Sequence, residues 1–374
     1  MSENPAVEAL AVAVAARVPV LLWGAPGTGK TSAIRAMAET MGLPCETVIA
    51  SIREPSDFAG LPVISGGSSP GDSTVDKTVH FAPPRWAQRL AEAGTGILFL
   101  DELSTAPPAV QAALLRVVLE RTVGDLALPA DVAVVAAANP PEQAADGWDL
   151  SAPLANRLCH LSWETTPKSI ADGLASGWSA PDVPLLPDGW ESGELLNRGL
   201  VATFLRARPA LAIAPPADAT AAGRGWPSPR TWEMAARLVT AAAAAGASDQ
   251  ARSALIRGAV GEGAGVEFLA WVTEMDLPDP EAVLADPDSF RLPERGDRAY
   301  AALASIAAAV AALPTPHRWI AGWRVLGSCA ETAPDVAATA AMVLAKCRPP
   351  DMEPGQMPPE IKMFLPLIRD AGLV

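Results

Sequence analysis

A glycine-rich loop between a strand pattern and a helix pattern constrains this chain more than any other feature. The run Val18–Trp23 is short and apolar, which is typical of a buried parallel strand. Directly after the loop, Thr31–Met41 carries apolar residues at helical spacing. The loop consists of Gly24, Ala25, Pro26, Gly27, Thr28, Gly29, Lys30 and Thr31. A strand, this loop and a helix in that order predict a phosphate-binding loop, or P-loop.

The P-loop predicts a ligand as well as a local structure. Its glycines let backbone N–H groups turn inward around phosphates, and the N-terminus of the following helix adds a favourable dipole. We expect Lys30 to reach the β- and γ-phosphates of ATP and the Thr31 hydroxyl to ligate Mg²⁺. A glycine turn that binds nothing is the weaker interpretation, because the flanking strand and helix are the context that phosphate binding requires.

A second strand pattern ends in two carboxylates. The apolar run Ile97–Leu100 is followed directly by Asp101 and Glu102. Beside a P-loop, we expect Asp101 to hold the metal through its water shell and Glu102 to orient and polarise the attacking water. A solvated pair of acids at a strand end is the alternative, and it would be the better interpretation if the P-loop were absent.

Strand and helix patterns alternate as far as Trp163, which predicts an α/β fold with a parallel sheet. The further strand candidates are Glu46–Ala50, Val132–Ala138 and Leu158–Trp163. The helix candidates that separate strands include Pro84–Ala93 and Pro107–Leu119, and Pro5–Arg17 precedes the first strand.

Beyond Trp163 the β-branched runs disappear and only helical spacing persists. The helix candidates there are Leu195–Leu205, Pro229–Ala244, Asp249–Val260, Arg298–Leu313 and Ala333–Lys346, and a proline-rich tail covers Arg348–Pro359. We therefore divide the chain into an α/β nucleotide-binding core over residues 1–165, a helical lid with its linker over 166–260, and a helical C-terminal extension over 261–374.

Charge and hydropathy exclude several functional classes. The 28 basic and 42 acidic residues give a net charge of −14, so we expect the surface to repel nucleic acid. The apolar runs are too short to span a membrane, and the N-terminus lacks the pattern of a secretory signal, which predicts a cytoplasmic protein. The four cysteines and three histidines form no spaced cluster, so we assign neither a zinc site nor a disulfide.

Two further motifs follow the two carboxylates along the chain. Asn139 directly follows the strand candidate Val132–Ala138, and the stretch Leu154–Arg157 contains the step Asn156-Arg157. With the P-loop and the two carboxylates, these residues resemble the AAA+ ATPases, and most of all the MoxR branch, which is similar to the magnesium-chelatase and RavA ATPases. The resemblance covers Ala6–Ala244 and is most specific as far as Arg157. It implies an AAA+ P-loop core followed by an α-helical lid and a helical C-terminal region.

The resemblance also implies roles for three side chains. Asn139 is the sensor that positions the attacking water, Arg157 is the arginine finger for a neighbouring subunit's γ-phosphate, and Arg230 is the second sensor at the start of a lid helix. A turn asparagine and two surface arginines are the alternatives. The family commonly has an acidic and an aromatic residue around the finger, whereas Asn156 and Leu158 flank Arg157 here.

Two segments resemble the insertions of the MoxR branch. One hairpin is expected near 54–83, with a polar loop at Ser65–Asp72, and another near 120–130 with a Gly-Asp turn. The resemblance implies that both face a ring's pore or a client. For the loop Ser65–Asp72, disorder is an equal alternative.

The leading functional hypothesis is an ATPase that assembles into a ring, expected to be a hexamer, and remodels or assembles a protein partner. In the MoxR branch that client is often a von Willebrand factor A domain protein. One alternative is a nucleotide-gated scaffold with slow turnover, and intact Lys30, Asp101, Glu102 and Asn139 argue against it. The other is a nucleic-acid-associated NTPase motor, which the acidic composition disfavours.

Overall fold

The computed structural model describes residues 5–65, 78–140, 148–178, 181, 183–350, 352 and 357–370. Its chain forms two compact units. Unit 1 comprises residues 1–186 and 213–265, and unit 2 comprises residues 187–212 and 266–374.

Unit 1 is built on a five-stranded sheet in the order β2-β5-β8-β1-β9, and every pair of neighbouring strands is parallel. The strands are β1 (Val20–Trp23), β2 (Cys45–Ile49), β5 (Thr95–Asp101), β8 (Asp131–Ala138) and β9 (Cys159–Ser162). This arrangement confirms the predicted α/β fold with a parallel sheet. In the chain order, each of the five strands starts within three residues of a strand that the sequence predicts.

Helices cover both faces of the sheet. One face, which carries Leu98, Leu100 and Val134, shares a core with α4 (Arg85–Ala93) and α5 (Pro108–Glu120). On the sheet's other side, α1 (Pro5–Ala15) packs on β1, β8 and β9 through a fully buried alanine-rich segment. Unit 1 also contains the helices α2 (Lys30–Thr40), α3 (Ser56–Ala59), α6 (Ala152–Ala155), α7 (Pro167–Ser176) and α9 (Ala219–Ala222).

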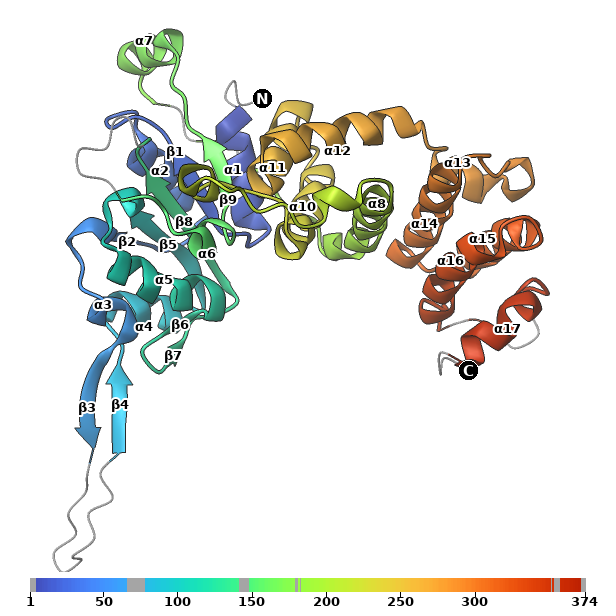
Figure 1. Ribbon diagram of the computed structural model, residues 1–374, viewed down its shortest axis with the longest axis horizontal. Coiled ribbons are helices and arrows are strands. Elements are labelled where there is room, and N and C mark those ends of the chain that lie inside the picture. Colours follow the sequence, from blue (N-terminus) through green and yellow to red (C-terminus); the bar gives the residue numbers. More distant parts are fainter. Residues whose placement is uncertain are drawn as a thin grey trace, which may run out of the picture. The chain divides into compact units, whose positions relative to one another are not determined.

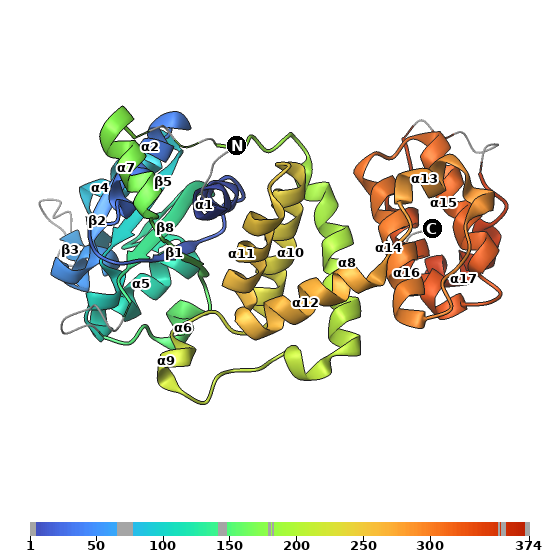
Figure 2. The same cartoon turned by 90° about the horizontal axis from the view of Figure 1, so that it is seen from above.

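Two long helices complete unit 1. They are α10 (Pro229–Ala244) and α11 (Asp249–Val260), which pack on each other and on α1 (Figures 1 and 2). The side chain of Glu8 in α1 accepts hydrogen bonds from the backbone N and Oγ of Ser248, at 2.8 and 2.5 Å, directly before α11 begins. The helix pair is thereby fixed to the helix that lies against the sheet.

Unit 2 is entirely helical among the residues described. Its helices are α8 (Glu194–Ala207), most of α12 (Glu262–Met275), α13 (Pro280–Ala285), α14 (Gly296–Ala312), α15 (Pro316–Cys329), α16 (Pro334–Lys346) and α17 (Ile361–Asp370). Trp319 and Trp323 of α15 are at the centre of its core, and the Trp319 indole donates to the Leu344 carbonyl at 2.8 Å.

The structure divides the helical half differently from the boundaries at residues 165 and 260. The segment 166–260 contributes α10 and α11 to unit 1, but its helix α8 belongs to unit 2. Aromatic packing accounts for this placement. The ring centre of Phe204 in α8 lies 5.2 Å from that of Phe268 and 5.5 Å from that of Trp271, both in α12.

Within the described residues, no helix combines the length and the apolar character that crossing a bilayer requires.

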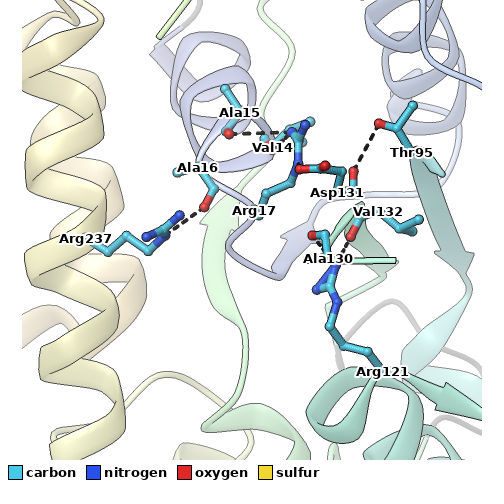
Figure 3. Close-up of polar contacts among 10 residues, drawn as sticks. All are labelled: Val14, Ala15, Ala16, Arg17, Thr95, Arg121, Ala130, Asp131, Val132 and Arg237. Carbon is cyan, nitrogen blue, oxygen red and sulfur yellow. Dashed lines mark hydrogen bonds and ion pairs between the residues drawn. The ribbon is translucent and has the colours of Figure 1, made fainter. Parts of the chain in front are cut away.

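The sheet edge where β5 and β8 begin is held by arginines that end helices (Figure 3). Arg17 follows α1 with a φ of 58°, and its Nε lies 3.6 Å from a carboxylate oxygen of Asp131, the first residue of β8. Arg121 ends α5 with a φ of 52° and donates to the Ala130 carbonyl at 3.1 Å. Arg237, which lies within α10, donates to the carbonyl of Ala16, the residue after α1, at 2.8 Å. Burial lowers the pKa of Arg121, and the charge of Arg17 lowers it further.

Two antiparallel hairpins extend from unit 1. They are β3–β4 (Leu61–Ser65 with Thr78–Ala82) and β6–β7 (Thr122–Val123 with Leu126–Ala127). They occupy the segments 54–83 and 120–130, where the sequence suggests insertions, and β3–β4 projects away from the sheet (Figure 1). Of the polar loop Ser65–Asp72, residues 66–72 lie outside the described residues.

The Gly124-Asp125 turn of β6–β7 meets the base of β3–β4, with a glycine on each side. Asp125 accepts a hydrogen bond from the Phe81 backbone N at 2.6 Å, and its own N donates to the Phe81 carbonyl at 3.0 Å. A Cβ placed on Gly60 would lie 2.7 Å from the Gly124 Cα, and one placed on Gly124 would lie 2.5 Å from the Phe81 oxygen. Both glycines also have positive φ, so no other residue fits this junction without strain.

We predict that Gly124→Ala destabilises the protein more than Gly94→Ala. Both positions have positive φ, which costs an alanine about 1–2 kcal/mol. A Cβ at Gly94 meets nothing within 4 Å, whereas at Gly124 it collides with backbone, so only Gly124→Ala must also open the junction. Urea unfolding followed by circular dichroism measures the difference. Equal losses in the free energy of unfolding would contradict the junction described here.

Candidate active site

The carboxyl ends of three neighbouring strands converge on one cavity. In the sheet order β5-β8-β1, Asp101 ends β5, Asn139 follows β8, and the P-loop follows β1. The cavity has a volume of about 350 Å³. It is lined by the P-loop from Pro26 to Thr31, by Ser32, by Asp101 and Glu102, and by residues 137–139 at the end of β8. Gly24 and Ala25 are not part of this lining.

The P-loop backbone is bent at two glycines. Gly27 and Gly29 have φ values of 76° and 83°, a left-handed conformation that side chains with a Cβ rarely adopt. The Thr28 hydroxyl donates to the Ala25 carbonyl at 2.7 Å, which closes the turn from within. Helix α2 starts directly at Lys30, so its N-terminal N–H groups lie at the cavity. This combination is suited to a phosphate group.

Lys30 joins the P-loop to the end of β8. Its buried Nζ donates to the carbonyls of Gly24 and Ala25, at 2.6 and 2.9 Å, and to Oδ1 of Asn139 at 3.2 Å. Burial lowers the pKa of Lys30, and the nearby charge of Asp101 acts against that shift. The lysine therefore lies within reach of both a phosphate in the P-loop and the Asn139 amide.

Thr31 and Asp101 provide the oxygen atoms that Mg²⁺ prefers. The Thr31 hydroxyl donates to Oδ2 of Asp101 at 2.9 Å, so both oxygens are within reach of one ion. In the part of the chain that the structure describes, no group of three or more His, Cys, Asp or Glu side chains could hold a metal. One hydroxyl and one carboxylate fit Mg²⁺, which usually completes its octahedron with phosphate oxygens and water.

Glu102 has a strained backbone and a defined partner. Its φ of 58° is unusual for a residue with a side chain, and its N donates to Oδ1 of Asp101 at 3.0 Å. The Ser51 hydroxyl donates to Oε2 of Glu102 in a short contact. Ser51 follows β2, the neighbour of β5, and Ser104 similarly accepts from the Asn139 N at 3.3 Å. Neither serine belongs to a predicted site motif, although Ser51 directly follows one predicted strand and Ser104 lies shortly after another.

Comparison with known proteins agrees with this geometry. Residues 19–158 match the AAA domain of the dynein-related subfamily. This segment is an AAA domain. No curated protein matches the chain.

Two solved structures are similar to the chain. One is the "putative ATPase" of Cytophaga hutchinsonii, with 19% identity, a TM-score of 0.42, and coverage of 67% of this chain and 79% of that one. The other is a full-length MCM homolog from Methanopyrus kandleri, with 19% identity, a TM-score of 0.35, and coverage of 71% of this chain and 54% of that one.

Arg157, in the AAA domain, and Arg230, in α10, lie near each other, and neither belongs to the cavity lining. Asn156 connects them, because its Oδ1 accepts from the Ser228 hydroxyl at 2.8 Å and from Nη1 of Arg230 at 3.5 Å. Arg157 Nη1 donates to the Pro153 carbonyl. Burial lowers the pKa of Arg157, and the charge of Arg230 lowers it further. The two guanidinium groups thus form a second cationic site in unit 1, separate from Lys30.

His160 of β9 links the strand before the P-loop to the turn before Arg157. The Trp23 indole donates to His160 Nδ1 at 2.9 Å, so the neutral ring carries its hydrogen on Nε2, which lies 2.9 Å from the Ala155 carbonyl. The Arg224 guanidinium lies 3.7 Å from the Trp23 ring centre. Desolvation lowers the pKa of His160 to about 4, which keeps the ring neutral at physiological pH.

We predict that His160 makes stability depend on pH between about 6.5, the ordinary pKa of histidine, and about 4. As the pH falls through this window, the unfolded chain takes up a proton that the folded chain excludes, so stability is lost. His160→Gln should show a smaller fall in melting temperature across the window than the wild type. His317→Gln, which changes an exposed histidine in unit 2, should keep the wild-type dependence. Identical pH profiles for His160→Gln and the wild type would refute the assignment.

Proposed function

We propose that the AAA domain is a Mg²⁺-dependent ATPase, and that the chain uses hydrolysis to remodel or assemble a protein partner in the manner of the MoxR branch. One observation carries the proposal. Lys30, Thr31, Asp101, Glu102 and Asn139 line or border one cavity at the carboxyl ends of three adjacent strands. These residue types are what phosphoryl transfer to water uses for phosphate charge, metal, water and positioning.

Each side chain has a defined task in this proposal. Lys30 neutralises β- and γ-phosphate oxygens, and Thr31 and Asp101 hold Mg²⁺, which when bound would neutralise developing charge on the phosphates. Glu102 orients and polarises the attacking water, with its carboxylate held by Ser51. Asn139 lies 3.2 Å from the lysine nitrogen, where it positions that water relative to the γ-phosphate.

A ring assembly supplies the remaining charge. Arg157 lies outside the cavity lining of its own domain, which supports a role at a neighbouring subunit's nucleotide. An arginine supplied in trans stabilises charge in the transition state, and we propose a hexamer in which each interface is completed in this way. Nη1 of Arg230 lies 3.5 Å from Oδ1 of Asn156, the residue next to Arg157. Arg230 serves as the second sensor.

A protein is the proposed client, and a von Willebrand factor A domain protein is its proposed type. The β3–β4 hairpin exposes Leu61, Val63, Ile64, Val79 and Phe81, and exposed apolar groups of this kind support contact with a protein. The net charge of −14 argues against a nucleic-acid client. The proposed location is the cytoplasm.

Lys30→Ala should largely abolish binding of Mg-ATP, because the cavity loses its buried point charge. Isothermal titration calorimetry measures the affinity. Lys168→Ala is the matched control, since it removes a lysine from an exposed pair with Asp172 at 3.4 Å and should bind as the wild type does. Wild-type affinity in Lys30→Ala would exclude the P-loop as the nucleotide site.

Mixing two inactive variants tests the role of Arg157. Glu102→Gln should bind ATP without turnover, and Arg157→Ala should bind ATP and hydrolyse it about 10³- to 10⁵-fold more slowly. If the arginine acts in trans, mixed assemblies regain activity at interfaces that combine an intact Glu102 with an intact Arg157. Arg116→Ala, which removes an arginine from an exposed pair with Glu120, should leave hydrolysis unchanged. Mixed assemblies that form without recovering activity would contradict the trans role.

A further inference from the structure

We infer that Trp163 and Thr165 are positioning residues for the nucleotide phosphates, acting through the Thr28 carbonyl of the P-loop. This inference deepens the proposed function and rests on nucleotide binding at the P-loop. Trp163 and Thr165 follow β9, whereas Thr28 follows β1, so the contact joins two neighbouring strand ends.

Two donors meet the same carbonyl oxygen. The Trp163 indole Nε1 donates to the Thr28 oxygen at 3.1 Å, and the Thr165 hydroxyl donates to it at 3.2 Å. A carbonyl oxygen has two lone pairs, so both bonds can form together. Neither Trp163 nor Thr165 is part of the cavity lining, and Thr28 and Gly29 both are.

The direction of this carbonyl sets the direction of the next N–H. In a trans peptide, the C=O of Thr28 and the N–H of Gly29 lie in one plane and point in opposite directions. The chain has no cis peptide bond among the described residues, so this geometry holds here. Fixing the Thr28 oxygen toward Trp163 and Thr165 therefore directs the Gly29 N–H away from them, toward the side on which a phosphate would bind.

Gly29 needs this restraint. Its φ of 83° lies in the left-handed region, and a glycine has many alternative conformations in which its N–H would point elsewhere. A P-loop binds phosphate through backbone N–H groups that already point inward, so a peptide unit that rotates freely weakens binding. Two external hydrogen bonds on one peptide unit remove that freedom before the nucleotide arrives.

Trp163 is itself held against the P-loop. Its backbone N donates to the Trp23 carbonyl at 2.6 Å, and the residue is only 6% exposed. A Cβ placed on Gly24 would lie 2.6 Å from the Trp163 oxygen and 3.4 Å from the indole Cδ1 atom. The first P-loop residue therefore lies in direct contact with Trp163, which leaves the indole little room to move away from Thr28.

The test compares affinities for Mg-ATP and for Mg-tripolyphosphate in the full-length chain by calorimetry. Trp163→Phe keeps an aromatic ring but loses the donor, and Thr165→Val keeps the shape but loses the hydroxyl. Each should weaken both ligands by about 2- to 10-fold, the loss expected for one hydrogen bond. The double variant should lose more than either, and Thr165→Ser should bind as the wild type does.

The binding stoichiometry separates positioning from a merely structural role. Positioning predicts a higher Kd with an unchanged number of sites, whereas damage to the fold removes sites and leaves the Kd of the rest unaltered. Trp178→Phe and Thr40→Val are matched controls, because they remove an exposed indole and a helix hydroxyl that bonds to Ala36, and both should bind normally.

Two results would overturn the inference itself. A folded double variant with wild-type Kd for both ligands is the most direct, and Thr165→Val provides the same test if Trp163→Phe does not fold. A loss of sites at constant Kd would assign Trp163 and Thr165 to stability alone. A wild-type chain that binds neither ligand would instead refute the proposed function on which the inference rests.

Discussion

The parallel pairing of β1 between β8 and β9 is the constraint on which the AAA domain depends. Val20–Trp23 pairs with Val135–Ala138 on one side and with Cys159–Ser162 on the other. Because all three strands run in the same direction, the residues that follow them meet at one edge of the sheet. Lys30 can reach the Asn139 amide at 3.2 Å only because this register places the two strand ends level with each other.

The same register gives β9 two connections. Trp163 and Thr165 contact the P-loop at one end of the strand, and His160 contacts both Trp23 and the Ala155 carbonyl beside it. The short strand β9 therefore connects the cavity to the turn that carries Arg157. At the opposite edge of the sheet, Arg17 and Arg121 hold the start of β8, so the strand that precedes Asn139 is fixed at both ends.

Local sequence was sufficient to predict the strands and helices that build the sheet, because their patterns lie in neighbouring residues, and it placed Gly24–Thr31 and the acid pair after two of those strands. Contacts between distant segments were not predictable in this way. Ser51 meets Glu102 only because β2 and β5 are neighbours, and α8 joins unit 2 because its aromatic partners lie about 60 residues further on.

Some helices were missed although a local signal existed. The helices α7 and α15 each begin with a threonine cap followed by proline, at Thr166-Pro167 and Thr315-Pro316. In both, the threonine hydroxyl accepts a hydrogen bond from the backbone N of the residue three positions later. In α12, by contrast, apolar and small residues occur all round the helix, so its sequence has little amphipathic pattern to detect.

The most direct test of this account is release of inorganic phosphate from ATP by the purified wild-type chain, measured with Mg²⁺ and again after removal of the metal with a chelator. The arrangement of Lys30, Thr31, Asp101, Glu102 and Asn139 predicts phosphate release that saturates with ATP and requires the metal. Nucleotide that binds in the presence of Mg²⁺ but is never cleaved, with assembled chains and across a range of ATP concentrations, would contradict it.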